Sequence, residues 1–177
     1  MLYGKQVVAI YTWRHEMAGG GLELEIQEAI GQTLGRGMSE ERIWKITELA
    51  ERKRFNGGDT IVRQFDKNSD LIIVLDGTAQ IKTFNDDLIT EIGAGSIIGE
   101  ISLVDEQPRS ATIRSTLFTE VAVIPAAKLR DLLAKDPELA AAVYKNIAQT
   151  LCTRLRHATI HLDGLMSSKG PIPVGRG

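Results

Sequence analysis

Residues 99–112 read GEISLVDEQPRSAT, a short apolar run that a Gly-Glu pair opens and a Pro-Arg pair closes. The apolar ending SII comes directly before it, and the apolar runs ATIRSTLF and EVAVI overlap or follow it. The apolar positions inside the stretch suit one turn of helix after Gly99. One carboxylate, Glu100, and one guanidinium, Arg109, are therefore placed nine residues apart in a region of short strands.

The sequence around this stretch has the pattern of an antiparallel β-structure. The runs TIVRQF, LIIVL, TAQIKTF and LITEI are short and apolar or alternating, and NGGD, DKNSD, DG, NDD and GAG separate them. Strands this short, with turn signals this frequent, predict a mainly β fold, an antiparallel barrel or sandwich. They do not favour a parallel sheet with crossover helices.

Helical patterns flank the predicted strands. Ser39 is a good N-cap for the segment SEERIWKITELAERK, and Asp136-Pro137-Glu138 is a strong helix start for a long helix that runs to about residue 163. We expect three regions: an N-terminal extension that is partly helical (1–37), the main domain with its C-terminal helix (38–163), and a disordered tail (164–177).

The long helix carries an apolar stripe with heptad-like spacing. Its members recur at steps of three and four residues: Tyr144, Ala148, Leu151, Leu155, Ala158 and Leu162. This stripe, which we call the seam, either packs on the β-structure or forms a helix–helix contact between two copies. The sequence leaves both alternatives open.

The charges of the opening stretch indicate a specific ligand. The guanidinium of Arg109 can bind two oxygens of one phosphate, and the turn at Gly99 lets a ligand approach the backbone. One Arg without a GxxxxGK[ST] loop suits a singly charged phosphodiester better than a triphosphate. Glu100 would repel a phosphate but can accept a hydrogen bond from a ribose hydroxyl. A phosphodiester and a free 2′-hydroxyl on one compact ligand describe a 3′,5′-cyclic nucleotide.

The stretch resembles the phosphate-binding cassette of the cyclic nucleotide-binding domain family, which includes catabolite activator proteins and regulatory subunits of cAMP-dependent protein kinase. The resemblance covers roughly residues 39–161. It implies a jelly-roll (double-stranded β-helix) barrel with N-terminal helices and a long C-terminal helix. We expect a stand-alone sensor module without a helix-turn-helix domain, because few residues follow residue 163.

The resemblance also implies roles for individual residues. Glu100 would accept the ribose 2′-hydroxyl and Arg109 would hold the exocyclic phosphate oxygens. The full set of expected ligand-binding residues is Gly99, Glu100, Ile101, Ser102, Arg109, Ser110 and Ala111. Candidates for a base cap on the last helix are Arg154, Leu155 and Ala158. The ligand would be cAMP or cGMP, and the order Arg-Ser-Ala favours cAMP. Phe65 and Asn68 stand where the family often has glycines.

Composition excludes several other classes of protein. The net charge of −2 gives no sign of a nucleic-acid surface, and no apolar run approaches the roughly 20 residues that span a bilayer. The single Cys152 fits a cytoplasmic location. His157 and His161 have helical metal spacing but no further ligand in the pattern, so we expect neither a metal site nor an enzyme.

The predicted function is therefore a regulatory module that binds cyclic nucleotide and signals by repacking its C-terminal helix. Its expected partners are a second copy, through the helix 137–163, and an effector protein, with no membrane and no direct DNA binding. One alternative is a transcription regulator of the catabolite-activator type, or a fragment of one. Another is a degenerate domain that mediates dimerisation without nucleotide.

Overall fold

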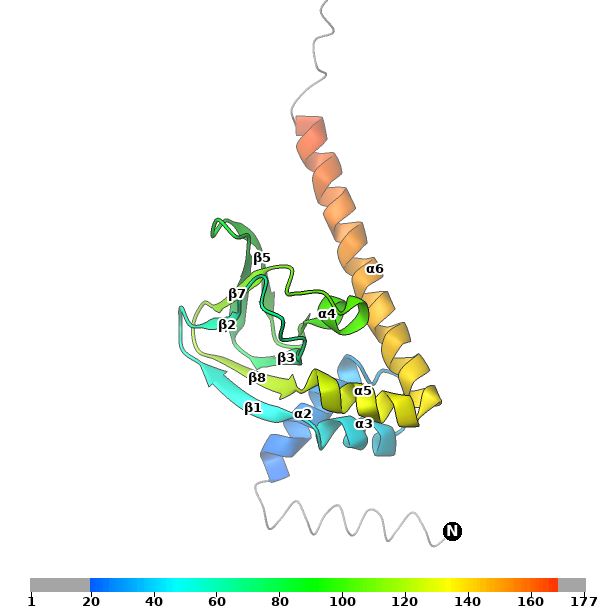
Figure 1. Cartoon of the computed structure of the whole chain (residues 1–177). Coiled ribbons are helices and arrows are strands. Elements are labelled where there is room, and N and C mark those ends of the chain that lie inside the picture. The colour runs from blue at the N-terminus through cyan, green and yellow to red at the C-terminus, as the bar shows by residue number, and fades with distance from the viewer. Residues whose placement is uncertain (1–19, 169–177) are drawn as a thin grey trace, which may run out of the picture.

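The computed structural model describes residues 20–168 of the chain (Figure 1). Its strands are β1 Glu51–Phe55, β2 Thr60–Val62, β3 Leu71–Asp76, β4 Thr78–Lys82, β5 Leu88–Gly93, β6 Ile97–Ile98, β7 Thr112–Ser115 and β8 Thr119–Ile124. Its helices are α2 Gly20–Gln32, α3 Glu40–Thr47, α4 Glu100–Asp105, α5 Ala126–Lys135 and α6 Pro137–Ser168. The expectations for residues 1–19 and for the end of the tail lie outside the described residues.

The strands form two open antiparallel sheets. The first sheet has the order β1-β8-β3-β6 and the second has the order β2-β7-β4-β5. The expected closed barrel is therefore wrong, and more residues lie in helices than in strands. The Asp76-Gly77 turn is one reason why the strands form two open sheets. It passes the chain from β3 in one sheet to β4 in the other instead of closing a hairpin. Gly77 has a φ of 84°, which only glycine adopts easily.

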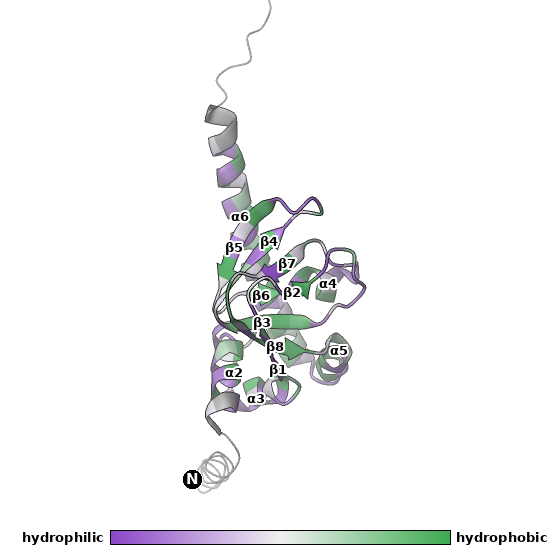
Figure 2. Cartoon of the chain, turned by 90° about the vertical axis from the view of Figure 1, so that its left-hand side faces the viewer, coloured by the Kyte–Doolittle hydropathy of each residue, from purple (hydrophilic) through white to green (hydrophobic). Residues whose placement is uncertain are grey.

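Alternating residues of β3 and β8 build two cores, one on each face of the first sheet. Ile72, Val74, Val121 and Val123 face the second sheet, where Val62, Ala79 and Ile113 pack against them. Leu71, Ile73, Ala122 and Ile124 face the helices. Both faces are buried, so β3 reads as a continuous apolar run and is coloured hydrophobic along its length in Figure 2.

The helices pack against the outer face of the first sheet. Helix α3 is shorter than the sequence pattern predicts: it ends at Thr47, and the polar run ERKRF forms strand β1, which pairs with β8. Register with β8 outweighs the helix propensity of these residues. Helix α6 starts where the sequence predicts, because the side chain of Asp136 accepts a hydrogen bond from the Leu139 N–H at 3.0 Å.

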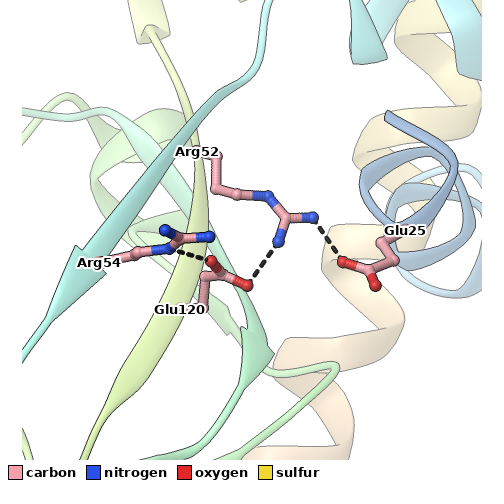
Figure 3. A network of polar contacts seen from close by, with 4 residues as sticks. All are labelled: Glu25, Arg52, Arg54 and Glu120. Atoms are coloured by element: carbon pink, nitrogen blue, oxygen red, sulfur yellow. Dashed lines mark hydrogen bonds and ion pairs between the residues drawn. The ribbon is translucent and has the colours of Figure 1, made fainter. Parts of the chain in front are cut away.

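A network of three ion pairs joins β1 to β8 and ties the N-terminal helix to the first sheet (Figure 3). Arg52 on β1 contacts Glu25 of α2 at 2.5 Å and Glu120 of β8 at 2.5 Å. Arg54 also contacts Glu120 at 2.5 Å, and these contacts hold the pKa of the Glu120 carboxyl below its usual value. Within residues 20–168, no helix is both long and apolar enough to cross a membrane.

Helix α6 has a buried half and a projecting half. Leu139, Val143 and Ile147 recur every four residues and are fully buried against the domain. Beyond them the helix extends past the sheets, as Figure 1 shows. The seam faces away from this contact: Tyr144, Leu155 and Leu162 are exposed, and Leu151 is the member that packs on the helical core.

Candidate functional site

A cavity of about 250 Å³ lies beside the stretch 99–112, which we call the cassette. The cavity, named here the cassette cavity, is lined by Val62, Ile81, Ile89, Ile97, Ile98, Gly99, Glu100, Ile101, Ser102, Arg109, Ser110, Ala111, Ile113 and Arg154. All seven expected ligand-binding residues and Arg154 therefore meet in one place. Leu155 and Ala158, the other two base-cap candidates, do not line this cavity, and Leu155 is 68% exposed.

Arg109 is held in the cavity wall by the loop between β2 and β3. Its Nη2 donates to the Asp70 carbonyl oxygen at 2.6 Å and lies 3.4 Å from Oδ1 of Asn68. The Asp70 carboxylate also accepts from the Ala126 N–H at the start of α5, at 3.0 Å. Asp70 thus joins the cassette to the C-terminal helices, a role that the sequence pattern did not reveal.

The other end of the Arg109 guanidinium is buried in the cavity wall. Arg109 is only 5% exposed, and its Nη1 is buried without a hydrogen-bond partner among residues 20–168. Burial lowers the pKa of this guanidinium, although nearby Asp70 and Glu100 oppose the effect. A buried N–H donor without a partner costs free energy, so an anionic oxygen that accepts from it would be strongly favoured.

Gly99 makes room for this guanidinium. Its φ of 91° places it in the left-handed region, and a Cβ there would lie 2.0 Å from Arg109 Nη1 and 2.6 Å from the Asp70 carbonyl oxygen. The residue is the N-cap of α4, as the sequence predicts for a helix that starts here. Any side chain at this position would displace Arg109 from the cavity wall.

Glu100 lies buried at the start of α4, 2% exposed, with an ion pair to Arg154 of α6. Arg154 also donates from Nη2 to the Ile97 carbonyl oxygen at 2.6 Å. Burial raises the pKa of the Glu100 carboxyl, and the charge of Arg154 partly offsets this rise. The long helix therefore reaches the carboxylate of the cassette directly.

The apolar part of the lining comes from residues that were not singled out in the sequence. Val62, Ile81 and Ile113 lie opposite one another on β2, β4 and β7, where register pairs Ile113 with both of the others. Alternation in TAQIKTF and ATIRSTLF marks these positions as facing one side of the sheet. This alternation could have identified the three lining residues, but only if the pairing of the strands had been known.

Phe65 and Asn68 take unexpected parts in the loop between β2 and β3. Phe65, not Asn68, has a positive φ, of 70°. The backbone of this loop pairs with the cassette: Phe65 N–H donates to the Arg109 carbonyl and Arg109 N–H donates to the Asp66 carbonyl, both at 2.9 Å. The Phe65 ring packs on Phe84 with ring centroids 5.9 Å apart. These contacts offset the roughly 1–2 kcal/mol cost of the left-handed conformation.

Acidic and histidine side chains do not form a metal centre in the described part of the chain. Among residues 20–168, no three His, Cys, Asp or Glu side chains are close enough to hold an ion. The site thus consists of a buried cation, a buried carboxylate and an apolar wall around one cavity. Two facing antiparallel sheets with such a cavity define a small-ligand-binding domain of the jelly-roll type.

Comparison with known proteins shows a likeness to one domain family. Residues 52–136, just under half of the chain, match the model of the cyclic nucleotide-binding domain. The crystal structure of a cyclic nucleotide-binding domain from Methylobacillus flagellatus is similar, with a TM-score of 0.72 and 26% identity over 87% of this chain and 88% of that one. The matched domain family is named for the binding of cyclic nucleotides.

Two bacterial regulators are also similar. The cAMP-activated global transcriptional regulator Vfr of Pseudomonas aeruginosa is 30% identical over 65% of this chain and 56% of its own length. The crystal structure of the Thermus thermophilus catabolite activator protein has a TM-score of 0.62 and 28% identity over 75% of this chain and 62% of that one. This chain spans less than two thirds of the length of either regulator.

Proposed function

We propose that the chain is a cAMP-responsive regulatory module whose ligand binds in the cassette cavity. The observation that carries the proposal is the pair of groups there: the unpartnered, buried Nη1 of Arg109 and the buried carboxylate of Glu100. Arg109 holds the phosphodiester, and Glu100 accepts from the ribose 2′-hydroxyl. The apolar residues on β2, β4 and β7 receive the apolar surface of the nucleotide.

The preference for cAMP rests on Ser110 and on two relatives. Ser110 lines the cavity and is exposed at its edge, next to Arg109. Vfr is described as cAMP-activated, and the Thermus thermophilus relative, 28% identical over 75% of this chain, is described as a cyclic AMP receptor protein. Ser110 and Ala111 form the phosphate-proximal part of the site, together with Gly99, Ile101 and Ser102.

The signal passes from the cavity to α6 through Arg154. Without nucleotide, Arg154 binds Glu100. A ribose hydroxyl that donates to the same carboxylate competes with Arg154, so nucleotide binding changes how the projecting half of α6 is held. Of the three base-cap candidates, Arg154 is the one that lines the cassette cavity and can contact the nucleotide. The output is a shift between two positions of α6 that an effector protein reads.

A second copy of the chain binds along the seam of α6. The exposed leucines of the seam, Leu155 and Leu162, recur at a heptad step and leave apolar surface in water. A parallel helix pair buries this surface, whereas the domain itself covers only Leu151. The module acts through protein contacts instead of direct DNA contact, since its net charge of −2 does not suit a phosphate backbone.

Calorimetric titration of the purified full chain with cAMP and with cGMP tests the ligand. We expect saturable binding of cAMP that is at least about tenfold tighter than that of cGMP. Arg109→Gln should abolish it, whereas Arg63→Gln, an exposed site on the neighbouring loop, should not. Absence of binding by the folded wild-type chain would instead support a degenerate module that dimerises without nucleotide.

A further inference from the structure

A second cavity of about 450 Å³ lies behind the cassette, between the end of α2, the turn from β5 to β6, and the middle of α6. We call it the rear cavity. Its wall includes Arg36, in the turn after α2, and Arg154 of α6, and its lining contains no carboxylate among the residues that the structure describes. Arg154 separates the two cavities, because it also lines the cassette cavity.

The positive charge of the rear cavity is poorly compensated. Arg36 has two long contacts with backbone carbonyl oxygens, to Thr33 at 3.3 Å and to Asn146 at 3.4 Å. It forms no ion pair with any residue between 20 and 168. Arg154 is already paired with Glu100 on the cassette side, so Arg36 is the guanidinium of this wall whose charge has no counter-ion among the described residues, and an anion that enters the cavity would supply one.

A neighbouring cavity shows that acidic and basic side chains line different hollows on this side of the domain. The cavity on the other side of the β5–β6 turn shares Gln32 and Gly95 with the rear cavity, but Glu25, Glu28, Asp76 and Glu120 line it. The acidic residues of this region therefore gather in one hollow and the arginines in the other. An anion approaching this side of the domain is directed to the rear cavity.

Hydroxyl groups give the rear cavity a second kind of chemistry. Three threonines in its wall donate to carbonyl oxygens four residues earlier in the chain: Thr33 to Ala29 at 2.6 Å, Thr150 to Asn146 at 3.0 Å and Thr153 to Gln149 at 3.0 Å. Because each hydroxyl proton is already used, the oxygen is left as an acceptor. The wall thus offers cationic donors for an anion and acceptors for hydroxyl groups.

We propose that the rear cavity binds a small phosphorylated polyhydroxy compound, such as a sugar phosphate, as a second ligand beside that of the cassette cavity. The phosphate lies against Arg36 and Arg154, and the hydroxyl groups donate to the threonine oxygens. The volume is within the usual 300–1,000 Å³ range of small-molecule sites. The backbone around Arg36 is held in place, because buried Asn146 donates to the Leu34 and Arg36 carbonyl oxygens at 2.7 and 3.1 Å.

Titration of the full chain with glucose 6-phosphate, with glucose as the uncharged control, tests this proposal. We expect glucose 6-phosphate to bind in the millimolar range or tighter and glucose not to bind measurably. Arg36→Gln should weaken binding at least about tenfold, since it removes a charged donor. Arg156→Gln makes the same charge change on α6 outside the cavity and should leave binding unchanged.

The variant Arg109→Gln separates this proposal from the nucleotide function. It disables the cassette cavity but leaves the rear cavity intact, so glucose 6-phosphate should still bind. Loss of binding in this variant would mean that the probe occupies the cassette, and would overturn the proposal. Full binding by Arg36→Gln, or no binding by the wild-type chain up to about 10 mM, would overturn it as well.

Discussion

Arg154 in the middle of α6 forms an ion pair with Glu100 at the start of α4, 54 residues earlier in the chain. The carboxylate side chain is 3% exposed and the Arg154 side chain is 39% exposed. A buried acid therefore meets a cation that remains in contact with water. This asymmetry allows a ligand to exchange with Arg154 at Glu100 without leaving a buried cation uncompensated.

Replacing Arg154 should destabilise the nucleotide-free chain. Arg154→Gln leaves the Glu100 carboxylate buried without its cation, and we expect the free energy of unfolding to fall by about 1–2 kcal/mol. The loss should be smaller than the roughly 3–5 kcal/mol of a fully buried pair, because water already screens Arg154. Chemical denaturation at neutral pH measures it. The double variant Glu100→Gln/Arg154→Gln should recover most of the loss, and equal stability of Arg154→Gln and Arg156→Gln would refute the expectation.

The pH dependence of stability should reveal the buried state of Glu100. Burial raises the pKa of this carboxyl in the folded chain, so the folded chain binds more protons than the unfolded chain above the ordinary carboxyl pKa. The contribution of this group to stability is then largest at low pH and declines as the pH rises through the raised pKa. Glu100→Gln lacks this decline. Thermal denaturation of both chains between about pH 4 and pH 7 should show the wild type losing stability relative to the variant; a relative gain would contradict the buried, raised pKa.

A methyl group at Gly99 should disable nucleotide binding, and Gly95 provides a matched control. Both glycines have positive φ, 91° and 80°, so alanine strains the backbone at each by roughly 1–2 kcal/mol. A Cβ at Gly95 meets nothing within 4 Å, whereas one at Gly99 clashes with Arg109. We expect Gly99→Ala to weaken cAMP binding at least about tenfold and Gly95→Ala to retain it. Similar affinities in the two variants would show that Arg109 does not need the space at Gly99.

The seam can be tested with one substitution on each side of α6. Leu155 and Ile160 are 68% and 69% exposed, but they lie about 140° apart around the helix. Leu155→Asp should shift the chain from dimer to monomer, because it places two carboxylates in the shared interface. Ile160→Asp adds the same charge outside the seam and should leave the dimer intact. Light scattering after size-exclusion chromatography measures both, and a monomeric wild-type chain at all concentrations would eliminate the seam as an interface.

Local patterns were sufficient for much of the fold and for the cassette. Turn residues and alternation located most of the strands, and Asp136 marked the start of α6 because N-capping is a local interaction. The cassette residues were found together because they are close in sequence. The predicted end of α3 was wrong, because residues 51–55 pair with β8, a strand almost 70 residues away in the sequence.

Residues from distant segments were harder to predict. Val62, Ile81 and Ile113 join the cavity only through the pairing of β2, β4 and β7. Asp70 and Asn68 looked like turn residues, yet their oxygens position Arg109. Arg154 was proposed as a base cap, and its contact with Glu100 depends on how α6 crosses the cassette. Each of these contacts spans more sequence than a local pattern can encode.

The sequence by itself determined the acid and the cation of the cassette, the glycine that precedes the acid, and the residues that start the long helix, because spacing and local hydrogen bonding specify these features. Only the tertiary structure decided that the sheets stay open, that Nη1 of Arg109 is left without a partner among the described residues, and that Arg154 closes on Glu100. The physical reason is that burial and pairing between distant segments depend on how the whole chain packs, and free energies of desolvation arise only once that packing exists.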